Sequence, residues 1–476
     1  MVTSPRLKWF GLALLGAVQF MVVLDIAIVN VALPSIQTDL GFSQANLQWV
    51  ISAYALVFGG FLLLGGRTAD LLGRRRIFMA GLILFTIGSL LCGLAWSEAS
   101  LIGARAIQGL GAATISPAAL AILMTTFAEG RERNIALGVW GAVGGFGAAA
   151  GVLLGGVLTD ALSWEWIFFV NIPVGLVAVA LAPLLLRESR DTNVKTFDAL
   201  GAVLVTAGLT GLVLGITQGR DWGWGSASTI GVFVASALLL LGFVAWENRV
   251  DEPLMRFGLL RTKTVLGANV AGFILGTALF SMFLMLTLYM QQVLGYSAMK
   301  TGVAYLAVAG TSIIWANVAA VLVNRVGVRP LIAGGMALLA VGMLLFTQVP
   351  VDGSYWTNLL PGFLIIAVGL AFCFVPISIA ALAGVNRSEA GIASGLINTT
   401  QQIGGAVGIA LLSTVAITRT ENEVASGTAV PEAMTSGFQL AFWVGTAVAL
   451  VGVIASLALI RQEEVESVPE PALEAA

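Results

Sequence analysis

One carboxyl group lies deep inside a long apolar run of this sequence. Asp25 is fourteen residues into the run 11–34, and no other run holds a carboxylate so far from its ends. A charged side chain at the centre of a bilayer costs at least about 2.5–3.5 kcal/mol, so its presence needs a reason. The chain has no histidine, the usual proton carrier near neutral pH, so carboxylates must do any proton chemistry. We therefore interpret Asp25 as a proton-coupling residue, and simple helix pairing as the less favoured explanation.

One guanidinium group also falls inside an apolar run. Arg105 lies about one helical turn from the end of the run 102–124. From there it could pair with the Asp25 carboxylate or with a bound anion. A long basic side chain near the end of a membrane helix can equally extend to the water interface. Position alone leaves these two explanations balanced.

A glycine-rich and arginine-rich loop separates the second and third apolar runs. Its glycines Gly66 and Gly73 allow a tight turn, and Asp70 can pair with Arg74 or Arg75 or cap a helix. Such contacts could hold one face of a transporter shut. The loop lacks the spacing of a phosphate-binding Walker A motif, so it does not indicate ATP.

Small residues recur along the fifth apolar run. Gly147, Gly151 and Gly155 follow one another at a spacing of four, and Gly156 is adjacent. This spacing lets membrane helices approach closely, and ordinary helix packing explains it by itself.

Adaptable or polar side chains elsewhere are candidates for lining a substrate path. Methionine and aromatic residues suit varied apolar ligands, and amides in a membrane helix face a partner or a cavity. Core packing is the commoner role for each methionine and aromatic residue. The candidates are Met21, Trp49, Tyr54, Met285, Tyr289, Asn398 and Gln402.

Composition places these residues in a membrane protein. The 476-residue chain is 58% apolar and 10% charged, against about 25% charged residues in a soluble domain. There is no basic stripe for nucleic acid and no cluster of catalytic side chains, so we expect neither a nucleic-acid partner nor an enzyme. Two isolated cysteines exclude a disulfide framework and disfavour a metal site.

Apolar runs long enough to cross a bilayer, about 20 residues each, occur fourteen times. They cover 11–34, 47–66, 77–96, 102–124, 135–158, 166–186, 198–217, 229–247, 266–290, 302–323, 330–348, 357–381, 391–416 and 437–460. Backbone polar groups cannot stay unpaired in lipid, which makes these runs helices. The sequence therefore predicts an all-α integral membrane protein with fourteen transmembrane helices.

Basic residues predict the orientation of these helices. Nineteen of the 23 Lys and Arg residues fall in loops and tails on the side that holds both termini, and cytoplasmic loops are enriched in these residues. Arginine greatly outnumbers lysine, which hints at a GC-rich bacterial genome. We expect a multi-pass protein of the bacterial cytoplasmic (inner) membrane, monomeric, with both termini in the cytoplasm.

Two loops repeat with one offset. Residues 40–43 resemble 294–297, and residues 70–75 resemble 324–329, each 254 residues later. Such parallel repeats are typical of transporters whose substrate site lies between two halves. We predict a six-helix half at 1–190, an inserted two-helix segment with linkers at 191–262, a second six-helix half at 263–461, and a disordered acidic tail at 462–476.

The inserted pair of helices lies outside the repeat. Neither helix has a charge at its centre, and Asp198 and Glu247 mark their inner ends. We expect the pair to lie at the periphery, to bridge the halves on the cytoplasmic side, and to stay out of the transport path.

These features together resemble the major facilitator superfamily, in particular its fourteen-helix drug:proton antiporters. Five stretches carry the resemblance: Leu24 to Pro34, the loop 65–76, Arg105 to Gly109, Gly147 to Gly156, and Trp164 to Pro173. The resemblance implies two six-helix repeats plus two inserted helices. It also implies that Asp25 and Arg105 serve coupling, that 65–76 is the gating loop, and that the glycine-rich helix is the antiporter helix.

The chain departs from this family pattern at two positions. Val152 follows Gly151 where proline is usual, and Leu71 replaces a usual basic residue. The runs of the second half contain no deep acid, which disfavours dicationic substrates.

The leading functional hypothesis is a proton-coupled antiporter that exports small amphipathic or hydrophobic compounds. Its partners are the substrate, protons and the bilayer, its energy source is the proton gradient, and it needs no cofactor. The alternative within transport is a dedicated exporter of one endogenous metabolite or antibiotic. The alternative from another class is a membrane receptor or channel, although the sequence shows neither a signalling domain nor a filter loop or ring of charges.

Overall fold

The regular elements of the computed structural model are all helices. The structure describes residues 5–127, 131–190, 198–251, 253–255, 257–383, 385 and 390–461, and the predicted tail 462–476 lies outside them. Within this part, thirteen helices are long and apolar enough to cross a membrane, and a shorter apolar segment covers Phe146–Ala161. Together they coincide with the fourteen predicted runs, so the predicted fold class is confirmed.

The helices fall into three groups along the chain. The first comprises α1 (Pro5–Leu40), α2 (Trp49–Leu72), α3 (Arg74–Gly93), α4 (Glu98–Thr126), α5 (Arg131–Ala161), α6 (Trp166–Phe169) and α7 (Asn171–Leu185). The inserted pair is α8 (Ala199–Trp222) and α9 (Ala227–Glu247). The last comprises α10 (Lys263–Leu288), α11 (Ala298–Val326), α12 (Val328–Phe346), α13 (Leu360–Ala380), α14 (Ala390–Ala425) and α15 (Val430–Leu459), with short 3₁₀ or π segments at Phe257–Arg261, Tyr289–Val293 and Tyr355–Leu359.

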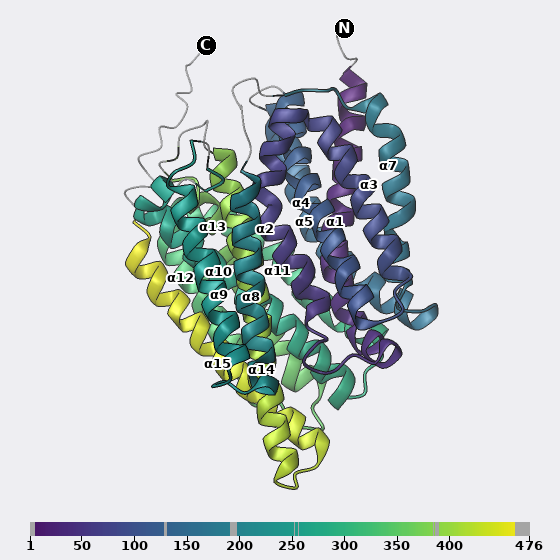
Figure 1. Ribbon diagram of the computed structural model, residues 1–476, viewed down its shortest axis with the longest axis vertical. Helices are drawn as coiled ribbons and strands as arrows, with labels where there is room; N and C mark the ends of the chain where they lie inside the picture. Colours follow the sequence, from purple (N-terminus) through teal and green to yellow (C-terminus); the bar gives the residue numbers. More distant parts are fainter. Residues whose placement is uncertain are drawn as a thin grey trace.

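Several boundaries differ from the apolar runs. The helix α14 continues to Ala425 and α15 begins at Val430, so these two helices extend beyond their neighbours at one end of the molecule (Figure 1). A run ends where polar residues begin, but helical hydrogen bonding continues through them. The sixth run is divided at Val170 into α6 and α7, because Pro173 has no N–H to bond the carbonyl four residues earlier.

The two six-helix groups lie side by side. Figure 1 shows α1 to α7 in purple and blue beside α10 to α15 in green and yellow, and α1 begins at the end where α15 finishes. Contacts between the groups are made mainly by α5 with α11 and by α2 with α14. We name the end where α1 begins the inner end, following the predicted orientation, and the opposite end the outer end.

The repeated loops adopt repeated backbone conformations. Gly41 and Gly295 have φ of 68° and 66°, and Gly73 and Gly327 have φ of 118° and 83°. Only glycine adopts these angles without strain. Each glycine follows the end of a helix, so the conserved spacing of the repeat reflects the same helix termination in both halves.

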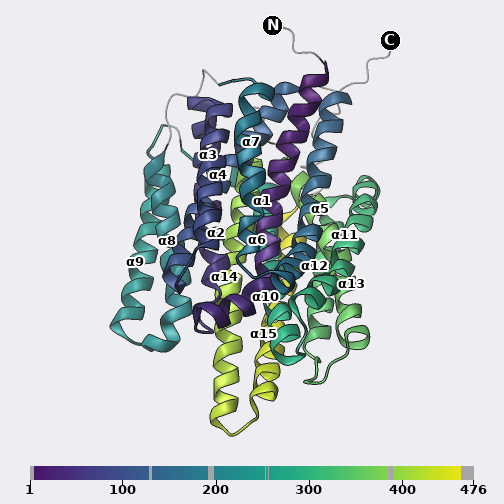
Figure 2. The same ribbon diagram turned by 90° about the vertical axis from the view of Figure 1, so that its right-hand side faces the viewer.

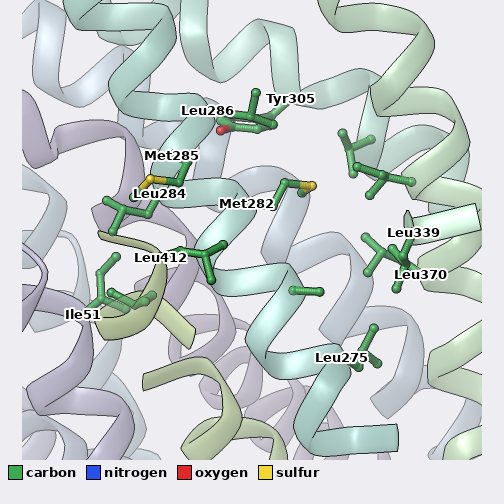
Figure 3. Packing of buried hydrophobic residues seen from close by; sticks show 14 of the residues in the cluster. Ile51, Leu275, Met282, Leu284, Met285, Leu286, Tyr305, Leu339, Leu370 and Leu412 are labelled. Atoms are coloured by element: carbon green, nitrogen blue, oxygen red, sulfur yellow. The ribbon is translucent and has the colours of Figure 1, made fainter. Parts of the chain in front are cut away.

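A continuous apolar cluster surrounds α10 and extends into the first half. Figure 3 shows Met282, Met285 and Tyr305 with leucine side chains of α10 and of neighbouring helices, and with Ile51 of α2. The first three are 1% exposed, and Tyr305 packs on Phe283 with ring centroids 4.7 Å apart. The two halves therefore share a close-packed apolar core.

The inserted pair α8 and α9 lies at one edge of the molecule (Figure 2), where α8 packs on both α2 and α14. Gln48 Nε2 donates to Thr217 Oγ1 at 3.2 Å, and Thr414 Oγ1 donates to the Ile216 carbonyl at 3.3 Å. Arg220 of α8 also forms an ion pair with Glu421 of α14. These bonds lie at the outer end of α8, whereas the sequence predicted a bridge on the cytoplasmic side: the polar bonds described here between α8 and the two halves are at the end opposite to the predicted one.

Reversing the charge of Arg220 should loosen this outer bridge. The variant Arg220→Glu places two carboxylates together, and in a chain that also carries Thr414→Cys we expect faster labelling of the new thiol by an impermeant maleimide. Loss of the partly exposed ion pair is worth up to about 1 kcal/mol, or about fivefold in the labelling rate, and repulsion between the carboxylates adds to this increase. The native Cys92 and Cys373 are buried and give little background. Adding Glu421→Arg to Arg220→Glu should restore slow labelling of the thiol at position 414. Equal labelling rates with and without the Arg220→Glu substitution would refute the bridge.

Candidate functional site

Asp25 lies at the centre of a buried polar network. Its side chain is fully buried in the middle of α1. Arg105 Nη1 donates to its Oδ2 at 2.7 Å, while Gln108 Nε2 and Asn171 Nδ2 donate to its Oδ1 at 2.7 and 2.8 Å. The carboxylate thus accepts charge-assisted bonds at both oxygens, which suits its ionised form.

Arg105 is held from several sides. It is 1% exposed, its Nε donates to the Val50 carbonyl at 2.9 Å, and its Nη1 also donates to Gln108 Oε1 at 2.6 Å. The guanidinium lies over the ring of Tyr54, 4.3 Å from the ring centroid, a favourable cation–π geometry. Of the two explanations that the sequence left balanced, the structure therefore places Arg105 against Asp25 and away from the water interface.

A second layer orients the residues that contact Asp25. Gln108 Nε2 donates to Ser89 Oγ at 2.8 Å, and Asn171 Nδ2 lies 3.4 Å from the same oxygen. Sequence reasoning missed Ser89 and gave Gln108 and Asn171 no role. The usable signal was polarity: each is a polar side chain inside an apolar run, and in lipid such groups need partners.

The network gathers five helices of the first half around one ionisable pair. Its members come from α1, α2, α3, α4 and the start of α7. The carboxylate of Asp25 and the guanidinium of Arg105 neutralise each other inside this network. Within the described residues, no group of three or more acidic, cysteine or histidine side chains could hold a metal ion.

Residues 15–409 match the sequence profile of the Major Facilitator Superfamily. The chain belongs to this superfamily. It is similar to the puromycin resistance protein pur8 of Streptomyces alboniger, with 41% identity over 98% of this chain and 93% of that protein. It is also similar to the cephamycin export protein CmcT of Amycolatopsis lactamdurans, with 42% identity over 85% of this chain and 84% of that protein.

A solved structure of another transporter shares the fold. A bacterial homologue of the human lysosomal transporter Spinster, in an inward-facing and unoccupied conformation, superposes with a TM-score of 0.69 at 16% identity. The match covers 98% of this chain and all of that one. The major facilitator fold is thus confirmed, and this chain is a multi-pass membrane transporter.

The residues of the predicted gating loop bond within their own half of this major facilitator protein. Arg74 pairs with Asp70 at 2.7 Å, and Gly73 takes a φ of 118° at the turn. Arg75 N donates to Glu188 Oε1 at 3.1 Å, and its Nη1 donates to the Leu186 carbonyl at 3.2 Å. Glu188, which the sequence analysis did not single out, ties the end of α7 to the start of α3. Gly66 packs on Pro117 of α4.

The antiporter-helix glycines pack on two different helices. A Cβ atom at Gly147, Gly151 or Gly155 would come within 2.7–3.2 Å of the backbone of α1. One at Gly156 would come within 2.6 Å of the Ala298 carbonyl at the start of α11. The spacing of four therefore supports close packing inside the first half, whereas Gly156 brings the two halves together.

The seven predicted substrate-lining residues have separate environments among the described residues. Met21 packs inside the first half, and Tyr54 is part of the Arg105 network. Tyr289 is buried, with its hydroxyl donating to the Pro350 carbonyl at 2.5 Å. Asn398 is exposed, and its amide donates to the backbone of its own helix. The remaining three are Trp49 in a cluster beside α8, Met285 at a small outer cavity with Gln48 and Ser413, and Gln402 against Gly59.

The outer end is closed by direct bonds between the halves. Gln291 Nε2 donates to the Val31 carbonyl at 2.7 Å, and Gln292 Nε2 donates to Gln37 Oε1 at 2.9 Å. Met299 N donates to Asp160 Oδ2 at 2.9 Å. These bonds and the α8 bridge hold the outer ends of α1, α5, α10 and α11 together.

Removing Arg105 should destabilise the protein strongly. The variant Arg105→Ala leaves the buried Asp25 carboxylate without its ion-pair partner, which costs about 3–5 kcal/mol of the free energy of unfolding. Denaturant unfolding of the purified protein measures this loss. In an Asp25→Asn background, removing Arg105 leaves no unpaired buried carboxylate. Arg105→Ala should therefore lower the free energy of unfolding by at least about 1 kcal/mol less than it does when Asp25 is present. Equal costs in both backgrounds would contradict the pairing.

A side chain at Gly156 should force the outer ends apart. In Gly156→Val the new Cβ would lie 2.6 Å from Ala298 O, well inside the contact distance of about 3.5 Å, so α5 and α11 must separate. Spin labels at Leu162 and Lys300 should then report longer distances than in the unsubstituted protein. Gly138→Val is the matched control, because a Cβ at this position of α5 has no neighbour within 4 Å. Identical distances in both variants would rule out a role for Gly156 in closure.

Proposed function

We propose that this transporter exports small amphipathic or hydrophobic compounds in exchange for protons, with Asp25 as the proton-carrying group. The observation that carries the proposal is the fully buried ion pair between Asp25 and Arg105, in a chain whose relatives are named resistance and export proteins. The proton gradient supplies the energy, and no cofactor takes part.

Protonation of Asp25 changes what holds α1 to α4. In the ionised state, the carboxylate attracts Arg105 in a low-dielectric surrounding, where the attraction is strong. A proton from water removes this charge, and Arg105 Nη1 retains Gln108 Oε1 as its partner. The proton returns to water when the site opens to the other side. Exchange requires that substrate binding and protonation favour opposite states, so that each drives the release of the other.

Export also requires the outer contacts to open. The bonds from Gln291 and Gln292 to α1 must break before a substrate can leave toward the outer side. Substrate enters from the inner side or from the lipid around it, which suits compounds with apolar surface. We propose that the chain acts as a monomer in the bacterial cytoplasmic membrane, with both termini in the cytoplasm.

A dedicated exporter of one compound is the second candidate. Some relatives are named for single compounds, such as the tetracenomycin C resistance and export protein of Streptomyces glaucescens, with 32% identity over 86% of this chain and 76% of that protein. Drug susceptibility of an efflux-deficient host separates the candidates: protection against several unrelated compounds supports broad export, and protection against one supports a dedicated exporter.

Replacing Asp25 by Asn should abolish the proposed coupling. In liposomes with an imposed pH gradient, Asp25→Asn should accumulate puromycin at a small fraction of the unsubstituted rate, since no proton can be released at this position. Asp221→Asn removes an exposed carboxylate at the outer end of α8 and should transport normally. Gradient-driven puromycin accumulation by Asp25→Asn at the unsubstituted rate would refute the coupling role.

A further inference from the structure

Asn171 contacts Asp25 through only half of its amide. Its side chain is 1% exposed, at the first residue of α7. Nδ2 donates to Asp25 Oδ1 at 2.8 Å and lies 3.4 Å from Ser89 Oγ. Within the described part of the chain, Oδ1 is buried and has no hydrogen-bond partner. An unpaired amide oxygen in a dry site is unfavourable, so its retention needs a reason.

A proton on Asp25 supplies the missing donor. The ionised carboxylate only accepts hydrogen bonds, whereas the neutral acid carries one O–H that must find an acceptor. An amide offers a donor and an acceptor at the same position. Rotation about its Cβ–Cγ bond lets Asn171 donate to the carboxylate in one state and accept from the acid in the other.

The other partners of Asp25 cannot do both. Arg105 has donors only, and the amide oxygen of Gln108 already accepts from Arg105 Nη1 at 2.6 Å. The charged and titratable groups that face Asp25 from the packed helices are Arg105 on α4, Tyr54 on α2 and Cys92 on α3. The Tyr54 hydroxyl also has no hydrogen-bond partner among the residues that the structure describes, so its contribution must be separated by experiment.

We propose that Asn171 is a positioning residue that holds Asp25 in both of its protonation states. The inference rests on the proposed function, because it gives the coupling carboxyl a partner throughout the transport cycle. It also assigns a role to the break between α6 and α7, since the break at Val170 sets where Asn171 enters the site.

Infrared difference spectroscopy of the purified protein tests this role without any substrate. The C=O stretch of protonated Asp25 is identified as the band that Asp25→Asn removes, and its intensity is followed against pH. In Asn171→Leu the anion loses a charge-assisted bond while the acid loses a weaker neutral one. The midpoint of the titration should therefore move in Asn171→Leu, and the band should shift as its O–H loses an acceptor.

Matched variants keep the test decisive. Asn269→Leu removes another buried amide, which lies on α10, donates to the Val265 carbonyl and accepts from Thr400 Oγ1, and it should leave midpoint and band unchanged. Asn171→Ala should shift both if Asn171→Leu does not fold. An unchanged midpoint and band in the folded Asn171 variants, or the same shift in Tyr54→Phe alone, would overturn the proposal. A spectral shift that depends on Asn171, in a protein whose pH-gradient-driven export is unchanged by Asp25→Asn, would support Asn171 and count against the proposed function.

Discussion

The requirement that one buried carboxylate and one buried guanidinium satisfy each other governs the first half of this transporter. Desolvating two charges costs more than their attraction returns unless further hydrogen bonds complete the geometry. Gln108, Asn171 and the Val50 carbonyl provide those bonds. Because these groups lie on different helices, the pair fixes how α1, α2, α4 and α7 converge.

The buried ion pair that the structure describes lies in the first half, whereas transport needs both halves. One link between them is α5. Gly151 lies against the Leu24 carbonyl, next to Asp25, and Gly156 lies against Ala298 of α11. The same helix therefore contacts the backbone beside Asp25 and, little more than one turn further on, the other half. In the cycle that we propose, a movement of α1 on protonation of Asp25 has a short, tightly packed route to the interface between the halves.

Sequence alone was enough to predict the helices and the repeat and to single out Asp25, because each leaves a local signal. These signals are an apolar run, a glycine at the end of a helix, and a charged residue deep inside an apolar run. Partners of Asp25 were harder to predict. Asn171 is 146 residues away from Asp25, and no periodicity relates two helices that meet only in three dimensions. Substrate-lining residues were predicted from residue type, which packing and binding share: Met285 both packs in the apolar cluster and lines the small outer cavity, whereas Tyr54 lies against Arg105.

The departure at Val152 can also be understood from packing. A proline at this position would kink α5, but α5 continues as a helix from Arg131 to Ala161. Its crossing with α11 is close because glycine occurs on both helices. A Cβ at Gly302 of α11 would lie 2.5 Å from the Val152 carbonyl of α5, and a Cβ at Gly156 of α5 would lie 2.6 Å from the Ala298 carbonyl of α11. Since two glycines set this approach, the contact that closes the outer end does not depend on a proline kink.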